Sequence, residues 1–310
     1  MKCILAVLLV TSFLYSAPAS AQQKPTDEWL TRPVDDRTFR TYLDFFQYDR
    51  RLPLELRSSD VQSSDIRVER ISFQSTPGIR ATAILYRPLA SAASGNPAII
   101  LLHGGGGPGK DGRPMTVVAE LLTRGGFTVL SMDMQYFGER KTDLLQTFSE
   151  DEKHDRLYNQ PAVHLAWVTQ TTKDVGRAVD YLVQHAGVSE NRIGLVGFSR
   201  GAISATIAGA VERRLNAVVL FYGGHFDAKE NGHLPAACPA NYVGRISPRP
   251  LLMINGVNDP DMIRDTSVLP LFRVGRMPKE IIWEDAGHQL PGPENLVKTL
   301  HWLRDKLKGS

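Results

Sequence analysis

The chain carries a series of short apolar runs, most of them separated by segments with helical periodicity. Residues 98–102 (Ala-Ile-Ile-Leu-Leu) are apolar throughout, which is typical of a strand buried on both faces of a sheet. Similar runs occupy 128–132, 193–196, 217–222, 251–254 and 280–283. Helical patterns occupy 115–123, 173–185, 202–211, about 261–272 and 294–307. This alternation predicts an α/β fold with a mostly parallel central sheet and helices on both of its faces.

The part of the chain before residue 90 has a different pattern. Residues 68–73 and 79–86 each alternate polar and apolar positions, and Pro77-Gly78 separates them. We therefore expect an antiparallel hairpin ahead of the parallel strands. Further upstream, aromatic and aliphatic residues at helical spacing predict a helix over 36–49, with the aspartate at 35 or 36 as its cap.

These patterns divide the chain into three parts. Residues 1–21 precede the fold, residues 22–65 form an N-terminal extension with the helix, and residues 66–310 form one α/β domain. The stretch 141–172 is long for a simple connection and carries Pro161 and several aromatic residues, so we expect it to form a cap over the edge of the sheet.

The first 21 residues have the layout of a secretory signal peptide. Lys2 precedes an apolar run at 4–14, and the small residues Ala19-Ser20-Ala21 follow. Cleavage after Ala21 predicts an exported protein, secreted or periplasmic in a bacterium. The run is too short to cross a bilayer, which takes ~20 residues, so we expect no membrane anchor.

Composition and cysteine content narrow the class of protein. With 42% hydrophobic and 22% charged residues the chain is an ordinary globular protein. Its 36 basic and 33 acidic residues nearly balance and no block of basic residues occurs, so we expect no nucleic-acid partner. Cleavage would remove Cys3 and leave Cys238 alone, which excludes an internal disulfide. We interpret Cys238 as a small packing residue.

The strongest chemical signal is Gly197-Phe-Ser-Arg-Gly201, which lies between a predicted strand and a predicted helix. A sharp strand-to-helix turn forces its central residue, Ser199, into a strained backbone conformation and exposes the hydroxyl. The chain passes close to itself at this turn, so the residues two before and two after the serine must be very small. The pattern predicts a nucleophilic serine.

A serine hydroxyl needs a base, and the base needs a carboxylate that orients it. His288 follows the last predicted strand, and Asp259 follows the strand before it. Asp261 is a near alternative to Asp259, and Asp227 is a more distant one. The order serine, acid, histidine is the one expected for this type of sheet, so we predict Ser199, Asp259 and His288 as catalytic residues.

A reaction at an acyl group also needs backbone N–H groups aimed at the developing oxyanion. One should be the N–H of Arg200, directly after the serine; the Arg200 side chain is given no role in the chemistry. The other should come from the glycines that follow His103 after the strand at 98–102. We expect Gly105 as the donor, with Gly104 as the alternative.

The same glycines also match parts of two nucleotide-binding motifs, because Gly104, Gly106 and Gly109-Lys110 have suitable spacing. Both motifs require a helix to begin inside them. Pro108 and Pro114 prevent this, and position 111 is Asp rather than Ser or Thr. We therefore expect no nucleotide and no other cofactor. The cluster of His225, Asp227 and His233 follows no specific ligand spacing, so no metal is expected either.

The serine turn, the His103–Gly107 glycines, Asp259 and His288 together resemble the α/β-hydrolase superfamily, and within it the dienelactone-hydrolase and acetyl-xylan-esterase-like branch. The resemblance covers about residues 68–307. It implies a cofactor-free serine esterase that acts on carboxylic esters by way of an acyl-enzyme, with a small-molecule or carbohydrate ester as substrate. Dienelactone hydrolases proper use cysteine as the nucleophile, whereas position 199 is serine.

Three points stay open at this stage. The same triad would also suit an exported peptidase or amidase, and a protein that kept the fold could bind without catalysis. Aromatic residues near the strand ends, Tyr136, Phe137, Trp167 and Phe226, are expected to bind substrate, although such residues often belong to the core. The aromatic helix face at 39–46 could cover the core or a second subunit, so oligomerisation is left open.

Overall fold

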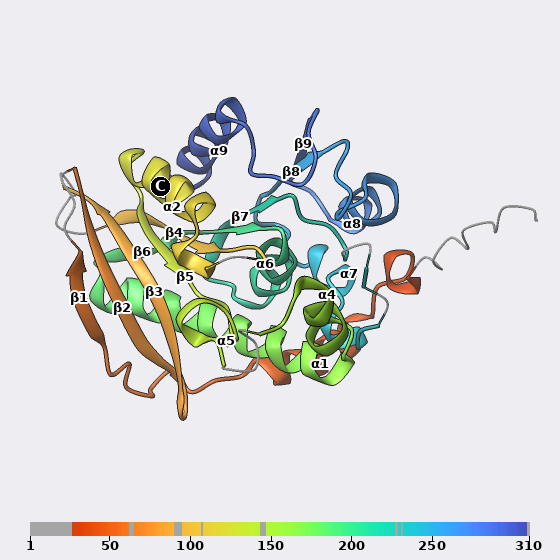
Figure 1. Ribbon diagram of the computed structural model, residues 1–310, viewed down its shortest axis with the longest axis horizontal. Helices are drawn as coiled ribbons and strands as arrows, with labels where there is room; N and C mark the ends of the chain where they lie inside the picture. The colour runs from red at the N-terminus through yellow and green to blue at the C-terminus, as the bar shows by residue number, and fades with distance from the viewer. Residues whose placement is uncertain are drawn as a thin grey trace, which may run out of the picture.

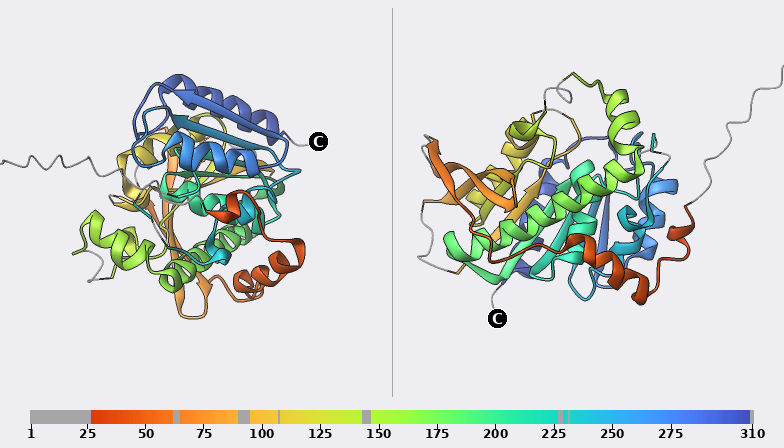
Figure 2. Two further views of the ribbon diagram at one scale, coloured as in Figure 1. Left: turned by 90° about the vertical axis from the view of Figure 1, so that its right-hand side faces the viewer. Right: turned by 90° about the horizontal axis from the view of Figure 1, so that it is seen from below.

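The computed structural model describes residues 27–61, 65–89, 95–106, 108–142, 147–226, 229–230 and 232–308. The predicted signal peptide, Gly107 and Asp227 lie outside these residues. Figures 1 and 2 show one α/β unit built around a twisted sheet.

A nine-stranded sheet runs through the described residues in the order β1-β2-β3-β5-β4-β6-β7-β8-β9. The strands are β1 (Arg57–Val61), β2 (Ile66–Thr76), β3 (Ile79–Pro88), β4 (Asn96–Leu102), β5 (Thr128–Met132), β6 (Val188–Phe198), β7 (Leu215–Phe221), β8 (Leu251–Gly256) and β9 (Lys279–Glu284). The pairs β1/β2, β2/β3 and β3/β5 are antiparallel, and the pairs from β5 to β9 are parallel. In Figure 1 the antiparallel strands form one end of the sheet and β8 and β9 the other. The predicted hairpin and the mostly parallel sheet are confirmed.

Helices cover both faces of this sheet. They are α1 (Asp36–Leu43), α2 (Arg113–Arg124), α4 (Glu150–Lys153), α5 (Pro161–His185), α6 (Arg200–Val211), α7 (Ala240–Val243), α8 (Leu269–Val274) and α9 (Pro293–Lys306). One core joins α5, α6 and α8 to the sheet, and a second core joins α2 and α9 to the opposite face. Seen from below, the long helix α5 lies across the sheet (Figure 2). Two cores around one sheet are the architecture of an α/β-hydrolase fold.

Four elements differ from the patterns in the sequence. Strand β1 was not predicted, because all of its residues are exposed and it therefore lacks an apolar pattern. It extends the sheet into the region expected to be a separate extension, by pairing with β2. Helix α5 begins at Pro161 rather than at 173, and proline at the first helical position is a usual start signal.

The other two differences are helix ends. The helix expected over 36–49 is capped by Asp35, whose side chain accepts the N–H of Thr38, but it ends at Leu43 and continues only as a 3₁₀ turn to Phe46. The helix expected over 261–272 starts later, as a π-helical turn at Arg264–Val268 followed by α8. Asp261 stays outside it because its backbone N–H is held by Asp259.

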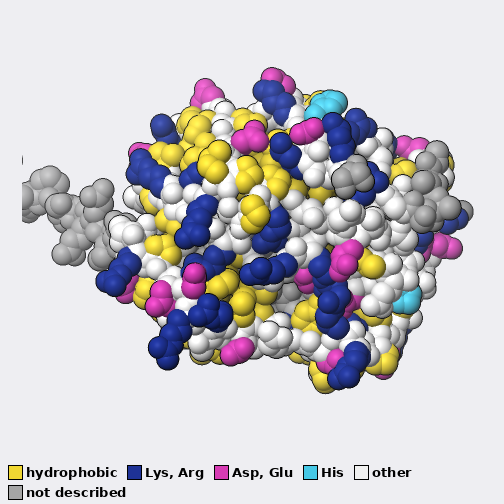
Figure 3. All heavy atoms as spheres, turned by 180° about the vertical axis from the view of Figure 1, so that it is seen from behind, with side chains coloured by type: hydrophobic (Ala, Val, Ile, Leu, Met, Phe, Trp, Pro, Cys, Tyr) yellow, Lys and Arg dark blue, Asp and Glu magenta, His cyan; other side chains and the backbone are white. Residues whose placement is uncertain are grey.

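The surface agrees with the balanced charge of the chain. On the face shown in Figure 3, lysine and arginine side chains are scattered among acidic ones rather than gathered into a single patch. In the part of the chain that the structure describes, none of the helices has the length and apolar character needed to span a membrane.

Candidate active site

Ser199 occupies the turn between β6 and α6, with φ 53° and ψ −117°. The positive φ places a residue with a side chain in a backbone region that normally favours glycine. The flanking glycines are required by packing: a Cβ on Gly197 would overlap the Gly201 carbonyl, and a Cβ on Gly201 would overlap the carbonyls of Leu102 and His103. The turn therefore has the close backbone approach that the sequence pattern predicts.

The structure brings Ser199, His288 and Asp259 into one line of hydrogen bonds. Ser199 Oγ lies 2.7 Å from His288 Nε2, and His288 Nδ1 lies 2.8 Å from Asp259 Oδ2. The second carboxylate oxygen of Asp259 accepts the backbone N–H groups of Asp261 at 2.8 Å and of Met262 at 2.9 Å. The Asp259 carboxylate is thus fixed on both sides, and its side chain is fully buried.

Asp261, the near alternative, takes a different position. Its Oδ2 lies 3.9 Å from His288 Nε2, on the serine side of the ring, and its side chain is 46% exposed. A carboxylate there faces the cavity rather than the Nδ1 atom of the histidine. Asp259 is therefore the residue placed to fix the tautomer of His288. The more distant alternative, Asp227, lies outside the described residues.

Aromatic rings hold the plane of the His288 imidazole. The ring stacks on Phe198, with centroids 5.6 Å apart, and meets the edge of Tyr222 at 6.0 Å. The Tyr222 hydroxyl donates a hydrogen bond of 2.6 Å to Glu284, the last residue of β9. The loop after β9 thus places His288 between two rings, Phe198 at the end of β6 and Tyr222 just after β7.

The glycine loop after β4 lies directly against the serine turn. A Cβ on Gly104 would be 3.4 Å from Ser199 Cβ, and a Cβ on Gly105 would be 3.5 Å from Arg200 Cβ. Both positions therefore border the site where a carbonyl attacked by Ser199 would sit. Side chains at positions 104 and 105 would therefore crowd this side of the site.

His103 orients the peptide between the two glycines. Its Nε2 accepts the N–H of Met134 at 3.0 Å, so the ring proton is on Nδ1, which donates to the Gly104 carbonyl at 2.6 Å. Complete burial lowers the pKa of His103 and keeps the ring neutral. In a planar trans peptide the C=O and the next N–H point in opposite directions. The N–H of Gly105 is therefore directed away from His103.

A cavity of about 510 Å³ opens beside Ser199. Its wall combines the glycine loop with residues of α2, of the serine turn and of two connecting segments. It is lined by His103, Gly104, Gly105, Gly106, Pro108, Gly109, Gly112, Pro114, Met115, His154, Tyr158, Phe198, Ser199, Arg200, Lys229, Asp261 and His288. His154, Tyr158 and Lys229 were not predicted, because neither the π-helical turn at His154–Tyr158 nor the loop with Lys229 carries a motif. Two of them belong to the stretch expected to form a cap.

The four aromatic residues predicted to bind substrate do not line this cavity. Phe137 and Trp167 are buried in the core, where Phe137 packs against the rings of His103 and Trp167. Tyr136 is half-buried against the same core, and Phe226, in the loop after β7, is buried against the ring of His164. The prediction is corrected here: large rings near the strand ends fill the layer under the cavity, as apolar side chains there generally do.

The side chain of Arg200 points away from the reacting atoms, as expected. Its guanidinium forms an ion pair with Glu230 and lies 3.6 Å from the centroid of the Tyr158 ring. This contact links the helix that begins after Ser199 to the two connecting segments of the cavity wall. Arg200 therefore supports the wall through its side chain, separately from its backbone N–H.

Lys110, which gave the glycine loop its likeness to a phosphate-binding motif, is fully buried. Its Nζ lies 2.8 Å from Asp133, 3.0 Å from Asp111 and 2.6 Å from Glu139. Burial alone would lower the pKa of Lys110, but the hydrogen bonds to these carboxylates outweigh it and raise the pKa. The ammonium group is occupied by carboxylates, so it is not presented to a phosphate.

Solved esterases share this fold. The acetyl xylan esterase from Paenibacillus sp. R4 matches with a TM-score of 0.69 and 14% identity, over 90% of this chain and 99% of that chain. Acetyl xylan esterase 1 from Thermoanaerobacterium sp. JW/SL YS485 matches with a TM-score of 0.65 and 16% identity, over 91% and 98% of the two chains. A cold-adapted esterase from an Arctic intertidal metagenomic library matches with a TM-score of 0.62 and 18% identity, over 82% and 100%. At such identities the likeness shows the fold alone.

The sequence itself identifies the family. No curated protein matches it. The family model described as the dienelactone hydrolase family matches residues 82–270, which include the glycine loop, the serine turn and Asp259. The match extends over more than half of the chain, and the chain belongs to the dienelactone hydrolase family.

Proposed function

We propose that the protein is a serine esterase that cleaves carboxylic esters through an acyl-enzyme. The observation that carries the proposal is the continuous line of hydrogen bonds from Ser199 through His288 to Asp259. The Asp259 carboxylate accepts a hydrogen bond from the Nδ1–H group of His288, which leaves Nε2 as the basic nitrogen next to Ser199. An imidazole in this tautomer is ready to take the serine proton.

The reaction follows from these positions. Ser199 Oγ forms a bond to the ester carbonyl carbon while its proton passes to His288 Nε2. The bond from carbon to the alcohol oxygen then breaks, and His288 returns the proton to the departing alcohol. In the second half, water gives a proton to His288 and attacks the acyl carbon, and Ser199 regains its proton as the acid leaves.

The oxyanion formed in each half would accept hydrogen bonds from the N–H groups of Gly105 and Arg200. Arg200 directly follows the nucleophile at the first turn of α6. The direction of the Gly105 N–H follows from the hydrogen bond between His103 and the Gly104 carbonyl, which favours Gly105 over Gly104 as the second donor. One donor of this kind stabilises a transition state by about 3–4 kcal/mol.

We infer that the preferred substrates carry a short acyl group. The glycine loop, Phe198 and Tyr158 stand close around Ser199, and the cavity of about 510 Å³ is at the small end of the range for ligand sites. Two structural neighbours are acetyl xylan esterases, which supports an acetyl ester of a carbohydrate as the substrate class.

The decisive experiment combines hydrolysis of nitrophenyl acetate with labelling by a fluorophosphonate. The wild-type protein should release nitrophenol and be labelled, and Ser199→Ala should do neither. Ser204→Ala is a matched control, because this buried serine lies further along the same helix and has no hydrogen-bond partner in the described residues. A folded wild-type protein that neither hydrolyses the ester nor is labelled would refute the proposal, and faster cleavage of a peptide library than of esters would indicate a peptidase.

We also propose that the protein is exported. The support is the charged, apolar and small-residue layout of residues 1–21. Expression of the full chain in a bacterium and N-terminal sequencing of the extracellular and periplasmic fractions tests it. A mature chain that starts at Gln22 is expected, and an intact chain recovered from the cytoplasm would contradict the proposal.

A further inference from the structure

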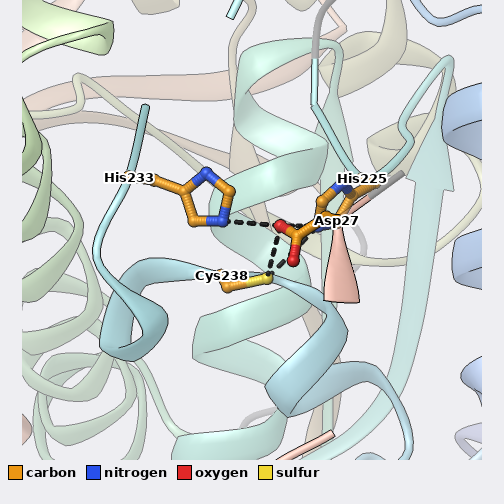
Figure 4. Close-up of side chains that lie close together, drawn as sticks. All are labelled: Asp27, His225, His233 and Cys238. Atoms are coloured by element: carbon orange, nitrogen blue, oxygen red, sulfur yellow. Dashed lines mark hydrogen bonds and ion pairs between the residues drawn. The ribbon is translucent and has the colours of Figure 1, made fainter. Parts of the chain in front are cut away.

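A second cluster of polar side chains joins the first described residue, Asp27, to the segments between β7 and α7. Asp27 precedes the first 3₁₀ turn, His225 and His233 belong to the segment after β7, and Cys238 precedes α7. None of the four lines the cavity beside Ser199. Figure 4 shows the four side chains directed toward one another from separate segments. The sequence shows His225 and His233 close together but predicts no metal, because Asp27, which completes the cluster with Cys238, is distant from them along the chain.

The donor atoms gather around one point. Asp27 Oδ2 lies 2.8 Å from His233 Nε2 and 3.3 Å from His225 Nε2. Cys238 Sγ lies 3.2 Å from His225 Nε2 and 3.7 Å from Asp27 Oδ2. The four atoms all lie within 4.8 Å of one another. Asp27 Oδ2 contacts all three of the other donor atoms, and His225 Nε2 and Cys238 Sγ also contact each other, so the atoms form a compact group.

We propose that Asp27, His225, His233 and Cys238 form a tetrahedral binding site for a divalent metal ion, with zinc as the preferred ion. One thiolate, two imidazoles and one carboxylate are ligands that zinc accepts. With the usual zinc–ligand bond lengths, tetrahedral donors are roughly 3.3–3.6 Å apart. The contacts of 3.2, 3.3 and 3.7 Å lie within or close to this range, whereas the 2.8 Å contact between Asp27 and His233 is shorter and would lengthen around an ion.

Charge and burial agree with a cation at this point. Burial opposes ionisation of Asp27, yet the hydrogen bonds from His225 and His233 hold the pKa of its carboxyl far below the usual value. Burial lowers the pKa of His225, so its imidazole is neutral, which is the form that binds metals. The Asp27 carboxylate and a Cys238 thiolate would together balance a dication.

Cys238 would bind the ion as a thiolate. Burial and the nearby charge of Asp27 raise the pKa of its thiol. In the absence of a cation the thiol keeps its proton. A metal ion would displace that proton to solvent and form the metal–sulfur bond, so binding should weaken as the pH falls.

A site with four protein ligands leaves no open position, so the ion would be structural. It would fasten the N-terminal segment to the loop between β7 and α7. The same loop carries Lys229, which lines the cavity, and Glu230, which pairs with Arg200. The metal would therefore hold one wall of the cavity from outside, and this role does not depend on the reaction at Ser199.

The first test is the metal content of the full chain. The purified protein is equilibrated with zinc, dialysed, and analysed by inductively coupled plasma mass spectrometry. One zinc ion per chain is expected, and Cys238→Ser or His233→Gln should weaken binding by more than about 100-fold. A folded wild-type protein that retains no zinc overturns the proposal, as does a Cys238→Ser variant that binds zinc as tightly as the wild type.

A matched control addresses the other group of donors. Asp259, Asp261 and His288 also lie close enough together to share an ion. Asp261→Asn and His288→Gln should therefore retain zinc if the proposed site is right. Zinc that is lost from these two variants and kept by His233→Gln would place the ion at Ser199 and overturn the proposal.

Cobalt provides a readout on the wild-type protein that needs no destabilising variant. Cobalt(II) in a tetrahedral site with a thiolate ligand shows an intense charge-transfer absorption in the near ultraviolet. Cys238 and Cys3 are the two cysteines of the chain, so the absorption should persist in Cys3→Ser. Loss of the absorption in Cys3→Ser, or a cobalt complex without any thiolate absorption, would overturn the assignment of Cys238 as a ligand.

Discussion

The line Ser199–His288–Asp259 and the cluster around Asp27 both combine histidine with aspartate, but in different arrangements. In the line, the two nitrogens of one imidazole face different partners, so a proton can enter at one side while the other side stays fixed. In the cluster, one nitrogen from each of two imidazoles faces a shared centre. If both proposals hold, the direction of the ring nitrogens distinguishes the site for proton transfer from the site for a cation.

The two regions also differ in their access to solvent. His288 borders the cavity and keeps 17% of its side chain exposed, which a substrate needs in order to reach Ser199. His225 and Cys238, both between β7 and α7, are buried. A site that turns over must open to its substrate, whereas a structural ion is held better when its ligands are enclosed.

The strongest test of whether the two regions are independent uses two variants, one in each region. Ser199→Ala should reduce kcat for nitrophenyl acetate by at least about 10³-fold, because the nucleophile is lost, and should leave the zinc content unchanged. Cys238→Ser should lose zinc and retain Ser199 labelling by a fluorophosphonate. Steady-state kinetics, labelling and metal analysis of both proteins check the pair; if each variant lost both properties, the two regions would not be independent.

The two aspartates near His288 provide the next test. Asp259→Asn should lower kcat by about 10⁴-fold, because an amide at this position favours the wrong tautomer of His288. Asp261→Asn should lower it by less than about 10-fold, since Asp261 faces Nε2 from 3.9 Å and is half exposed. Single-turnover measurements at pH 8 distinguish them, and equal losses would show that Asp261 shares the role assigned to Asp259.

The sequence could bring the residues of the first region together because they follow the strands of one parallel sheet. Ser199 follows β6, and Asp259 and His288 lie in the turns after β8 and β9, so the strand pattern alone places them at one edge. The alternation of apolar runs also predicted the sheet and both helical layers. Asp261 could not be separated from Asp259, because two residues of one turn differ only in which way their side chains point.

The second region could not be predicted because no element of regular structure brings it together. Asp27 and Cys238 meet through the packing of irregular segments, and neither segment has a periodic pattern. The same reason explains why His154 and Tyr158 were missed in the cavity wall, and why Phe137 and Trp167 were expected there. Residue type shows that a ring is apolar, but only packing decides whether it lines a cavity or fills the core.

His103 adds to the comparison, because both of its ring nitrogens, like those of His288, face fixed partners. His103→Gln should reduce kcat by about 10–100-fold with little change in KM, since the Gly105 N–H would lose its orientation toward the oxyanion. Phe137→Leu is the matched control, because it removes a ring packed on His103 without touching the bond to Gly104. Equal losses in both variants would mean that packing, and not the hydrogen bond, orients the glycine loop.

The last prediction concerns stability rather than activity. It involves His164, which lies between the two regions. Its ring stacks on Trp167 and meets Phe226, which in turn packs on His233. Neither ring nitrogen has a hydrogen-bond partner among the described residues. Burial lowers the pKa of His164 to about 3, and the nearby charge of Arg200 acts in the same direction. The folded protein therefore holds a neutral histidine in an apolar site.

This burial has a definite consequence for stability. The unfolded chain binds a proton at His164 below about pH 6.5 and the folded chain does not until about pH 3, so the free energy of unfolding falls as the pH is lowered through that interval. Between pH 6.5 and 5 the loss from this residue is about 2 kcal/mol. His164→Phe should remove that part of the loss in urea titrations, whereas the exposed His301→Phe should not; the same pH dependence in the wild type and His164→Phe would show that His164 is protonated in the folded state.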